Sequence, residues 1–174
     1  MKLLKKWATY GLFTLGNKAL SIYAIELTTA DMQRAIERHF PLRREKFFTE
    51  LTLSDPVIHL QEEAQRIGVN FAAMARLPGN ITIKWRGLVD GLLEYRRDIG
   101  SFYLLDLKLQ GTDSQGIPVK AMPVQPLVEK LLQRALANTP IYQLDDQDLN
   151  QAIARLLVKS IHIKKDRLIV ELGL

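Results

Sequence analysis

The chain has 174 residues, a formal net charge of +5 and no cysteine. This length fits one domain, and a hydrophobic content of 47% is enough for a core. The absence of cysteine excludes disulfides, thiolate nucleophiles and cysteine-ligated zinc. The basic residues lie in small dispersed clusters, which is more typical of solvated polar faces than of a nucleic-acid site.

The first 18 residues have the pattern of a targeting segment. Three lysines within residues 1–6 precede ten mostly apolar residues, 7–16, whereas a membrane-spanning helix needs about 20. The pattern fits a signal peptide or signal anchor, with Ala19–Ser21 as a cleavage region. It also fits an amphipathic helix on a membrane surface or in the core. We therefore divide the chain into a signal-like or anchor segment, 1–18, and one domain, 19–174, and leave cleavage open.

The next elements begin with a strand and a helix and continue with strands. Residues 20–27 alternate as a strand, and residues 28–40 have a helical stripe that starts at Thr28 or Thr29 and stops at Pro41. The hydrophobic period then changes to two, and short turns separate the segments. These segments predict an antiparallel meander with one solvated face. They are 47–53, 56–61, 66–77, 81–95, 101–109 and 117–122.

The helical period returns in the last third of the chain. Residues 124–137 carry a continuous apolar stripe, residues 147–159 predict a second helix, and residues 161–172 predict a hairpin. The predicted fold class is α+β. Its parts are a long curved antiparallel meander wrapped around the long helix of the C-terminal half, a second helix and a C-terminal β-hairpin.

The residue types needed for catalysis are not arranged in any pattern that indicates an enzyme. The histidines, His39, His59 and His162, are far apart in the sequence, and Asp145–Asp146 reads as the approach to a helix. Arg43–Arg44 could contact phosphate but reads more simply as a solvated cluster. Phosphate-binding loops and nucleophile elbows are absent from the sequence. We expect no enzymatic activity, no cofactor and no metal site. The aromatic residues do not interleave with basic ones, so we expect no nucleic acid as partner.

The order of elements resembles a known family. A strand leads into "LTTADMQRAIERHFP", a meander follows, and then come "VQPLVEKLLQRALANTPIY" and the terminal "IHIKKDRLIVEL". Over residues 20–173 this is similar to the YceB-like family of uncharacterised lipoproteins in the Gram-negative cell envelope. The resemblance implies a sheet curled around a long helix, similar to half of a tubular lipid-binding (BPI-like) module, which holds acyl chains between helix and sheet.

The resemblance also implies a location. Family members carry a lipobox cysteine that becomes the lipidated N-terminus, whereas this chain has Gly16–Asn17 at about that place. Lipid attachment at such a cysteine is therefore excluded. The expected location is periplasmic or membrane-associated in the cell envelope, with membrane-surface association through the N-terminal segment.

Two functions remain open from the sequence. The first is binding of a lipid or other apolar small molecule between helix and sheet. Such binding would be favourable, because burial of each methylene group of the ligand contributes about 0.8 kcal/mol. The alternative is an envelope protein–protein interaction or scaffolding module whose core is dry. The candidate ligand-lining residues are Phe71, Ile83, Trp85, Leu105, Val124, Leu127, Val128, Leu131, Leu132 and Leu136.

Overall fold

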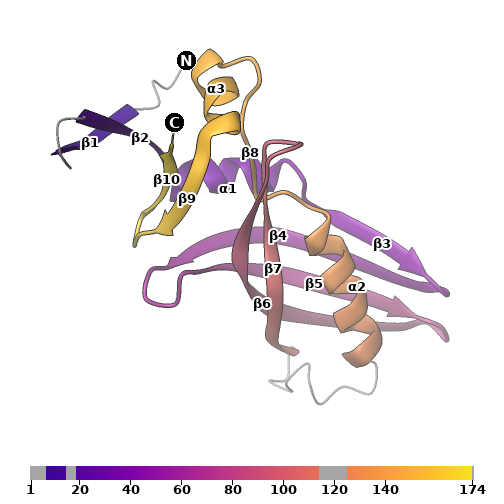
Figure 1. The fold of residues 1–174 in the computed structure, drawn as a ribbon. Coiled ribbons are helices and arrows are strands. Elements are labelled where there is room, and N and C mark those ends of the chain that lie inside the picture. The colour runs from indigo at the N-terminus through magenta and orange to yellow at the C-terminus, as the bar shows by residue number, and fades with distance from the viewer. Residues whose placement is uncertain (1–6, 15–18, 114–124, 174) are drawn as a thin grey trace.

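The structure, a computed structural model, describes residues 7–14, 19–113 and 125–173. In these residues two antiparallel sheets and three helices form the fold, which confirms the predicted α+β class (Figure 1). The small sheet has strand order β1-β2-β10-β9, and the large sheet has the order β3-β4-β5-β6-β7-β8. The small-sheet strands are β1 (Trp7–Thr14), β2 (Ala19–Thr28), β9 (Val158–Ile163) and β10 (Arg167–Leu172).

The large sheet is a meander, as the sequence predicts, because each strand pairs with its neighbours in the chain. The strands are β3 (Leu42–Lys46), β4 (Thr49–Gln61), β5 (Arg66–Leu77), β6 (Ile81–Arg96), β7 (Ser101–Asp113) and β8 (Tyr142–Gln143). The expected strand at 117–122 lies outside the described residues.

The prediction for residues 42–61 is wrong in two respects. The segment "LRREK" is the edge strand β3, which the sequence analysis missed because charged residues are typical of exposed edges and mask the strand pattern. The segments 47–53 and 56–61 are not separate strands but belong mostly to one strand, β4. Its register shifts between Ser54 and Val57, so Asp55 and Pro56 are accommodated in a bulge and do not end the strand.

Helix α1 (Thr29–Glu37) lies between the two sheets (Figure 1). It begins with a capping box, in which the Thr28 hydroxyl accepts from the Asp31 amide and the Asp31 carboxylate accepts from the Thr28 amide. Its buried side chains are Met32 and Ile36, and it contacts β2 on one side and β4 and β8 on the other. This helix therefore joins the two sheets into one hydrophobic cluster.

The other helices are α2 (Gln125–Ala137) and α3 (Leu149–Leu157), close to the predicted ranges. Helix α2 packs on the large sheet and contacts both β3, at one edge, and β7, close to the other. Helix α3 leads directly into β9 of the small sheet.

Residues 7–14 form a strand, so the interpretation of the N-terminal stretch as an amphipathic helix is wrong over these residues. Strand β1 pairs antiparallel with β2, from Trp7 opposite Ile25 to Thr14 opposite Ala19. Among the helices of the described residues, none has the length and hydropathy needed to cross a membrane. Cleavage of residues 1–18 and location in the cell envelope stay predictions.

Candidate functional site

The candidate site lies on the inner face of the large sheet, where β5 and β6 pair. The register places Phe71 opposite Gly87, Ala73 opposite Trp85 and Ala75 opposite Ile83. The alternation predicted for β6 is confirmed here, because these positions point to the core while Lys84 and Arg86 between them are exposed. Phe71 and Trp85 are buried, and Ile83 is partly buried against the same cluster.

The candidates on α2 are described only in part. Leu136 is buried in the same cluster. Leu127, Val128, Leu131 and Leu132 lie within α2, but their side chains are not among those described, and Val124 lies outside the described residues. The structure therefore brings Phe71, Ile83, Trp85 and Leu136 into one core and leaves the other helical candidates as predictions.

The assignment of Leu105 to the site is wrong. Simple alternation groups Leu105 with Leu107 and Leu109, but Leu105 is 41% exposed whereas Leu107 and Leu109 pack on the core. The register of β6 and β7 shifts between Asp90 and Leu92, and Asp106 has a φ of 49°. This bulge reverses the faces, so the buried neighbour is Leu104.

An arginine on β5 stabilises this bulge. Arg66 contacts Asp90 through Nε at 2.5 Å and Asp106 through an Nη at 3.0 Å, and it also donates to the Asp106 carbonyl at 2.6 Å. Burial lowers the pKa of Arg66, but the hydrogen bonds to Asp90 and Asp106 outweigh it, so the net shift is upward. The cation therefore stays charged and neutralises two carboxylates on the outer side of the sheet.

Trp85 contains a buried polar atom that has no partner in the part of the chain that the structure describes. Its side chain is 4% exposed, and its indole Nε1 makes no hydrogen bond to any described residue. A buried donor left unsatisfied costs about 1–3 kcal/mol, so such atoms are rare in folded proteins. The indole N–H could be satisfied by a ligand with an acceptor oxygen that enters between helix and sheet.

Gly87 and Gly91 of β6 have little free space around them. A methyl group added at Gly87 would lie 2.5 Å from the ring of Phe71, so this ring already fills the space above Gly87. At Gly91 the neighbouring atoms belong to β7, with the Leu105 carbonyl oxygen at 2.8 Å. Glycine at these positions thus allows close packing within the sheet, and neither position by itself forms a cavity.

A polar cleft of about 820 Å³ lies elsewhere. It is formed between α1 and residues 142–146, which comprise β8 and the three residues after it. Its lining residues are Asp31, Arg34, Ala35, Arg38, His39, Tyr142, Gln143, Leu144, Asp145 and Asp146. It mixes charges of both signs, and Arg34 is already paired with Asp31 at 2.6 Å. This composition does not suit an apolar ligand, and local periodicity could not predict the cleft because its two walls are more than 100 residues apart in sequence.

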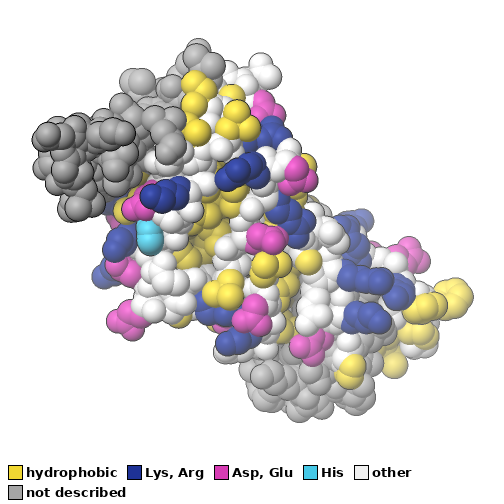
Figure 2. All heavy atoms as spheres, viewed as in Figure 1, with side chains coloured by type: hydrophobic (Ala, Val, Ile, Leu, Met, Phe, Trp, Pro, Cys, Tyr) yellow, Lys and Arg dark blue, Asp and Glu magenta, His cyan; other side chains and the backbone are white. Residues whose placement is uncertain are grey.

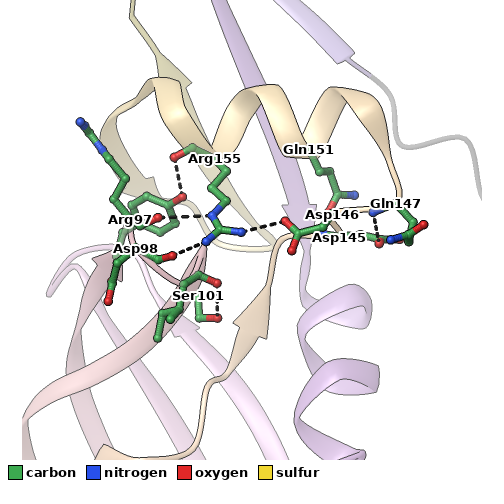
Figure 3. A network of polar contacts seen from close by, with 10 residues as sticks. Arg97, Asp98, Ser101, Asp145, Asp146, Gln147, Gln151 and Arg155 are labelled. Carbon is green, nitrogen blue, oxygen red and sulfur yellow. Dashed lines mark hydrogen bonds and ion pairs between the residues drawn. The ribbon is translucent and has the colours of Figure 1, made fainter.

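Asp146 belongs to a polar network around Arg155 of α3 (Figure 3). The guanidinium pairs with Asp146 at 2.9 Å and donates to the backbone carbonyls of Arg97 and Asp98, in the turn between β6 and β7. The Tyr95 hydroxyl donates to the Arg155 carbonyl at 2.7 Å. These groups are mutually satisfied, so the network is structural, and Asp145–Asp146 do form the approach to α3 as predicted.

The histidines are not brought together by the fold. His59 contacts Asn70 at 2.6 Å, and His162 lies beside Ser160 and Glu171. Within the part of the chain that the structure describes, three or more potential metal ligands do not gather at any point. The absence of an enzymatic or metal function stays a prediction.

Comparison with known proteins places these elements in a family. No curated protein sequence matches the chain. A family described as "Protein of unknown function (DUF1439)" matches residues 27–167, from the end of β2 to the start of β10. The match covers α1, the whole large sheet, α2 and α3, and because it spans most of the chain, the protein belongs to the DUF1439 family.

Proposed function

We propose that the protein binds a lipid or another apolar small molecule between α2 and the inner face of the large sheet. The observation that carries this proposal is the buried indole N–H of Trp85, which has no hydrogen-bond partner among the described residues and lies on an otherwise apolar face. A ligand with an alkyl chain and one acceptor oxygen, such as an ester or carboxylic acid, would match both features. Its chain would gain burial energy while its oxygen satisfied the indole.

The arrangement of α2 supports the proposal. Helix α2 contacts both β3 and β7, which belong to opposite sides of the six-stranded sheet, and these contacts support a sheet that curves towards the helix. We infer from this that the sheet curls around α2, as the resemblance to the YceB-like family and to BPI-like modules implies. A curved sheet over a single helix is a geometry in which an alkyl chain can lie parallel to the helix.

A dry core is the second candidate. The ring of Phe71 occupies the space above Gly87, so at this point the protein fills its own interior. If the remaining space is filled in the same way, the protein would act through its surface, as an interaction or scaffolding module of the cell envelope.

Native mass spectrometry of protein purified without detergent distinguishes the two candidates. We expect a discrete added mass that extracts into organic solvent as lipid. A bare protein mass that stays bare after incubation with lipid vesicles would overturn the proposal and favour the dry core. The same spectrum reports whether the chain begins at Met1 or has lost residues 1–18.

A Trp85→Phe variant then tests the role of the indole. It keeps an aromatic ring but removes the N–H, so we expect less bound lipid with no loss of thermal stability. The matched control is Trp7→Phe, which changes the other tryptophan, on β1 of the small sheet. Equal lipid content in Trp85→Phe and wild type would show that the indole does not contact the ligand.

A further inference from the structure

The turn between β3 and β4 carries two exposed phenylalanines. Phe47 and Phe48 form this two-residue turn, and they are 75% and 90% exposed. Their φ angles are 49° and 62°. Hairpin turns with two positive φ angles strongly favour Asn and Gly, and bulky side chains in this region are strained outliers. Neither ring is part of the core, so the fold supplies no reason for two aromatic residues at this turn.

A third exposed apolar side chain lies at the same end of the large sheet. Glu50 at the start of β4 lies opposite Arg76, and Leu77 lies opposite Ile81. The turn at 78–80 is therefore next to the Phe47–Phe48 turn. Ile81 is also exposed. We call Phe47, Phe48 and Ile81 the apolar tip.

Basic side chains of β3 and α2, two elements that contact each other, lie near the Phe47 side of the tip. The Lys46 ammonium lies 5.0 Å from the centroid of the Phe47 ring. The positive charge of Arg134 is the main cause that lowers the pKa of Lys46, and burial and Lys130 contribute further. Lys46 of β3 is therefore close enough to Lys130 and Arg134, both of α2, for these cations to repel it. We call Lys46, Lys130 and Arg134 the basic cluster.

The geometry of β3 places more positive charge on the same side. Arg44 and Lys46 alternate onto the face that carries the buried Leu42, whereas Glu45 points to the opposite face. At the right of Figure 2, where Figure 1 places the β3–β4 turn, hydrophobic side chains project beside a group of Lys and Arg side chains. Exposed apolar side chains next to positively charged ones complement an anionic membrane surface, which offers both apolar acyl chains and negatively charged headgroups.

We propose that this end of the large sheet docks on membranes that contain anionic lipids. Phe47 and Phe48 enter the interface between headgroups and acyl chains, and the basic cluster lies against the lipid phosphates. Aromatic rings partition favourably into this interface, and nearby lipid phosphates would offset the repulsion within the basic cluster. The apolar tip is distinct from strand β1, which pairs in the small sheet, and from the buried Trp85.

Vesicle co-sedimentation of the full chain tests the docking. We expect binding to vesicles of phosphatidylcholine with phosphatidylglycerol at low salt, and much weaker binding to phosphatidylcholine alone. High salt should weaken the binding to the anionic vesicles, because the attraction between surface charges is screened. Wild-type protein that binds neither kind of vesicle would overturn the proposal, and the apolar tip would then be assigned to a protein partner.

The decisive variant is Phe47→Asn with Phe48→Gly. Asn-Gly suits the turn, so the melting temperature should stay the same or rise. Binding to anionic vesicles should fall about tenfold or more, which corresponds to the loss of at least one inserted aromatic ring. The double variant Lys130→Gln with Arg134→Gln should lose most of the preference for anionic over neutral vesicles.

A matched control removes exposed apolar side chains elsewhere. Ile153 and Leu156 of α3 are 49% and 65% exposed, and their replacement by Ala should leave vesicle binding unchanged. If the Asn-Gly variant binds as wild type does, or if this control loses binding equally, the tip is not the docking surface. Trp85→Phe should keep vesicle binding, so failure of the ligand proposal and failure of the docking proposal give different results.

Discussion

Arg155 links α3 to the turn between β6 and β7. Its guanidinium satisfies two turn carbonyls and the Asp146 carboxylate. We predict that Arg155→Met lowers the free energy of unfolding by about 2–3 kcal/mol, because these acceptors lose charged donors. Urea denaturation measures the loss.

The control for this prediction is an arginine with one exposed partner. Arg34 is about half exposed and pairs only with Asp31 among the partners described, so Arg34→Met should cost less than about 1 kcal/mol. Equal losses in the two variants would show that Arg155 contributes no more than a surface ion pair.

The backbone of the same turn gives a second residue-scale prediction. Gly100 has a φ of 63°, and a methyl group there would lie 2.8 Å from Cδ of Arg155. Gly100→Ala should therefore cost more than about 1 kcal/mol, because the strain of the left-handed region is added to a clash. Thermal unfolding measures the cost.

A substitution at Gly79 separates the effect of backbone strain from the effect of the clash with Arg155. It also has a positive φ, 85°, but a methyl group there would have no neighbour within 4 Å. Gly79→Ala should show the cost of the backbone conformation alone. If it destabilises the protein as much as Gly100→Ala does, the contact with Arg155 is irrelevant.

At the scale of elements, periodicity predicts the faces of the long apolar strands well wherever these strands are regular. Strand β6 keeps its alternation through the inner positions of Ile83, Trp85 and Val89, so these were placed on the correct face. Strand β7 does not, because Asp106 adds a residue and moves Leu105 to the outside. A bulge of this kind depends on Arg66, which lies 40 positions away in the sequence, and no local pattern shows it.

The hairpin of β9 and β10 provides a pH prediction. Ser160 lies opposite Glu171, and its hydroxyl donates to the Glu171 carboxylate. This hydrogen bond, which outweighs the opposing effect of burial, is the main reason why the pKa of Glu171 is lowered from 4.5 in the folded protein, and His162 contributes to the same shift. The folded state therefore binds this proton less readily than the unfolded state does.

The direction of the pH dependence of stability follows from this difference in proton binding between the folded and unfolded states. The contribution of Glu171 to stability is present above about pH 4.5, the ordinary value, and is lost as the pH falls through the lower folded pKa. We predict that Ser160→Ala reduces the loss of stability on acidification, measured by urea denaturation from neutral to acidic pH. The control is Ser54→Ala, since Ser54 is on β4 of the other sheet and donates to Asp55. An unchanged acid dependence in Ser160→Ala would contradict the prediction.

At the scale of the whole molecule, the sequence did not predict two sheets. All of β10 pairs with residues 23–28 of β2. Glu26 forms an ion pair with Arg167 at 3.1 Å, although about 140 positions separate the two residues. Each of these strands was recognised by its own alternation. Alternation shows that a strand has a buried face but does not show which strand lies beside it, so the pairing of the two chain ends required the structure.

Because the two sheets share one core, we expect them to unfold together. Leu27 and Val170 of the small sheet, Leu53 of the large sheet, and Met32 of α1 belong to one buried cluster. We predict a single cooperative transition, in which Met32→Ala lowers the free energy of unfolding by about 2–5 kcal/mol.

Two single-tryptophan variants test it: in Trp85→Phe the remaining Trp7 reports on the small sheet, and in Trp7→Phe the remaining Trp85 reports on the large one. The urea midpoints of the two probes should coincide and should move together when Met32→Ala is added. Separate midpoints, or a shift in only one probe, would mean that α1 does not couple the sheets and that the two sheets unfold as separate units.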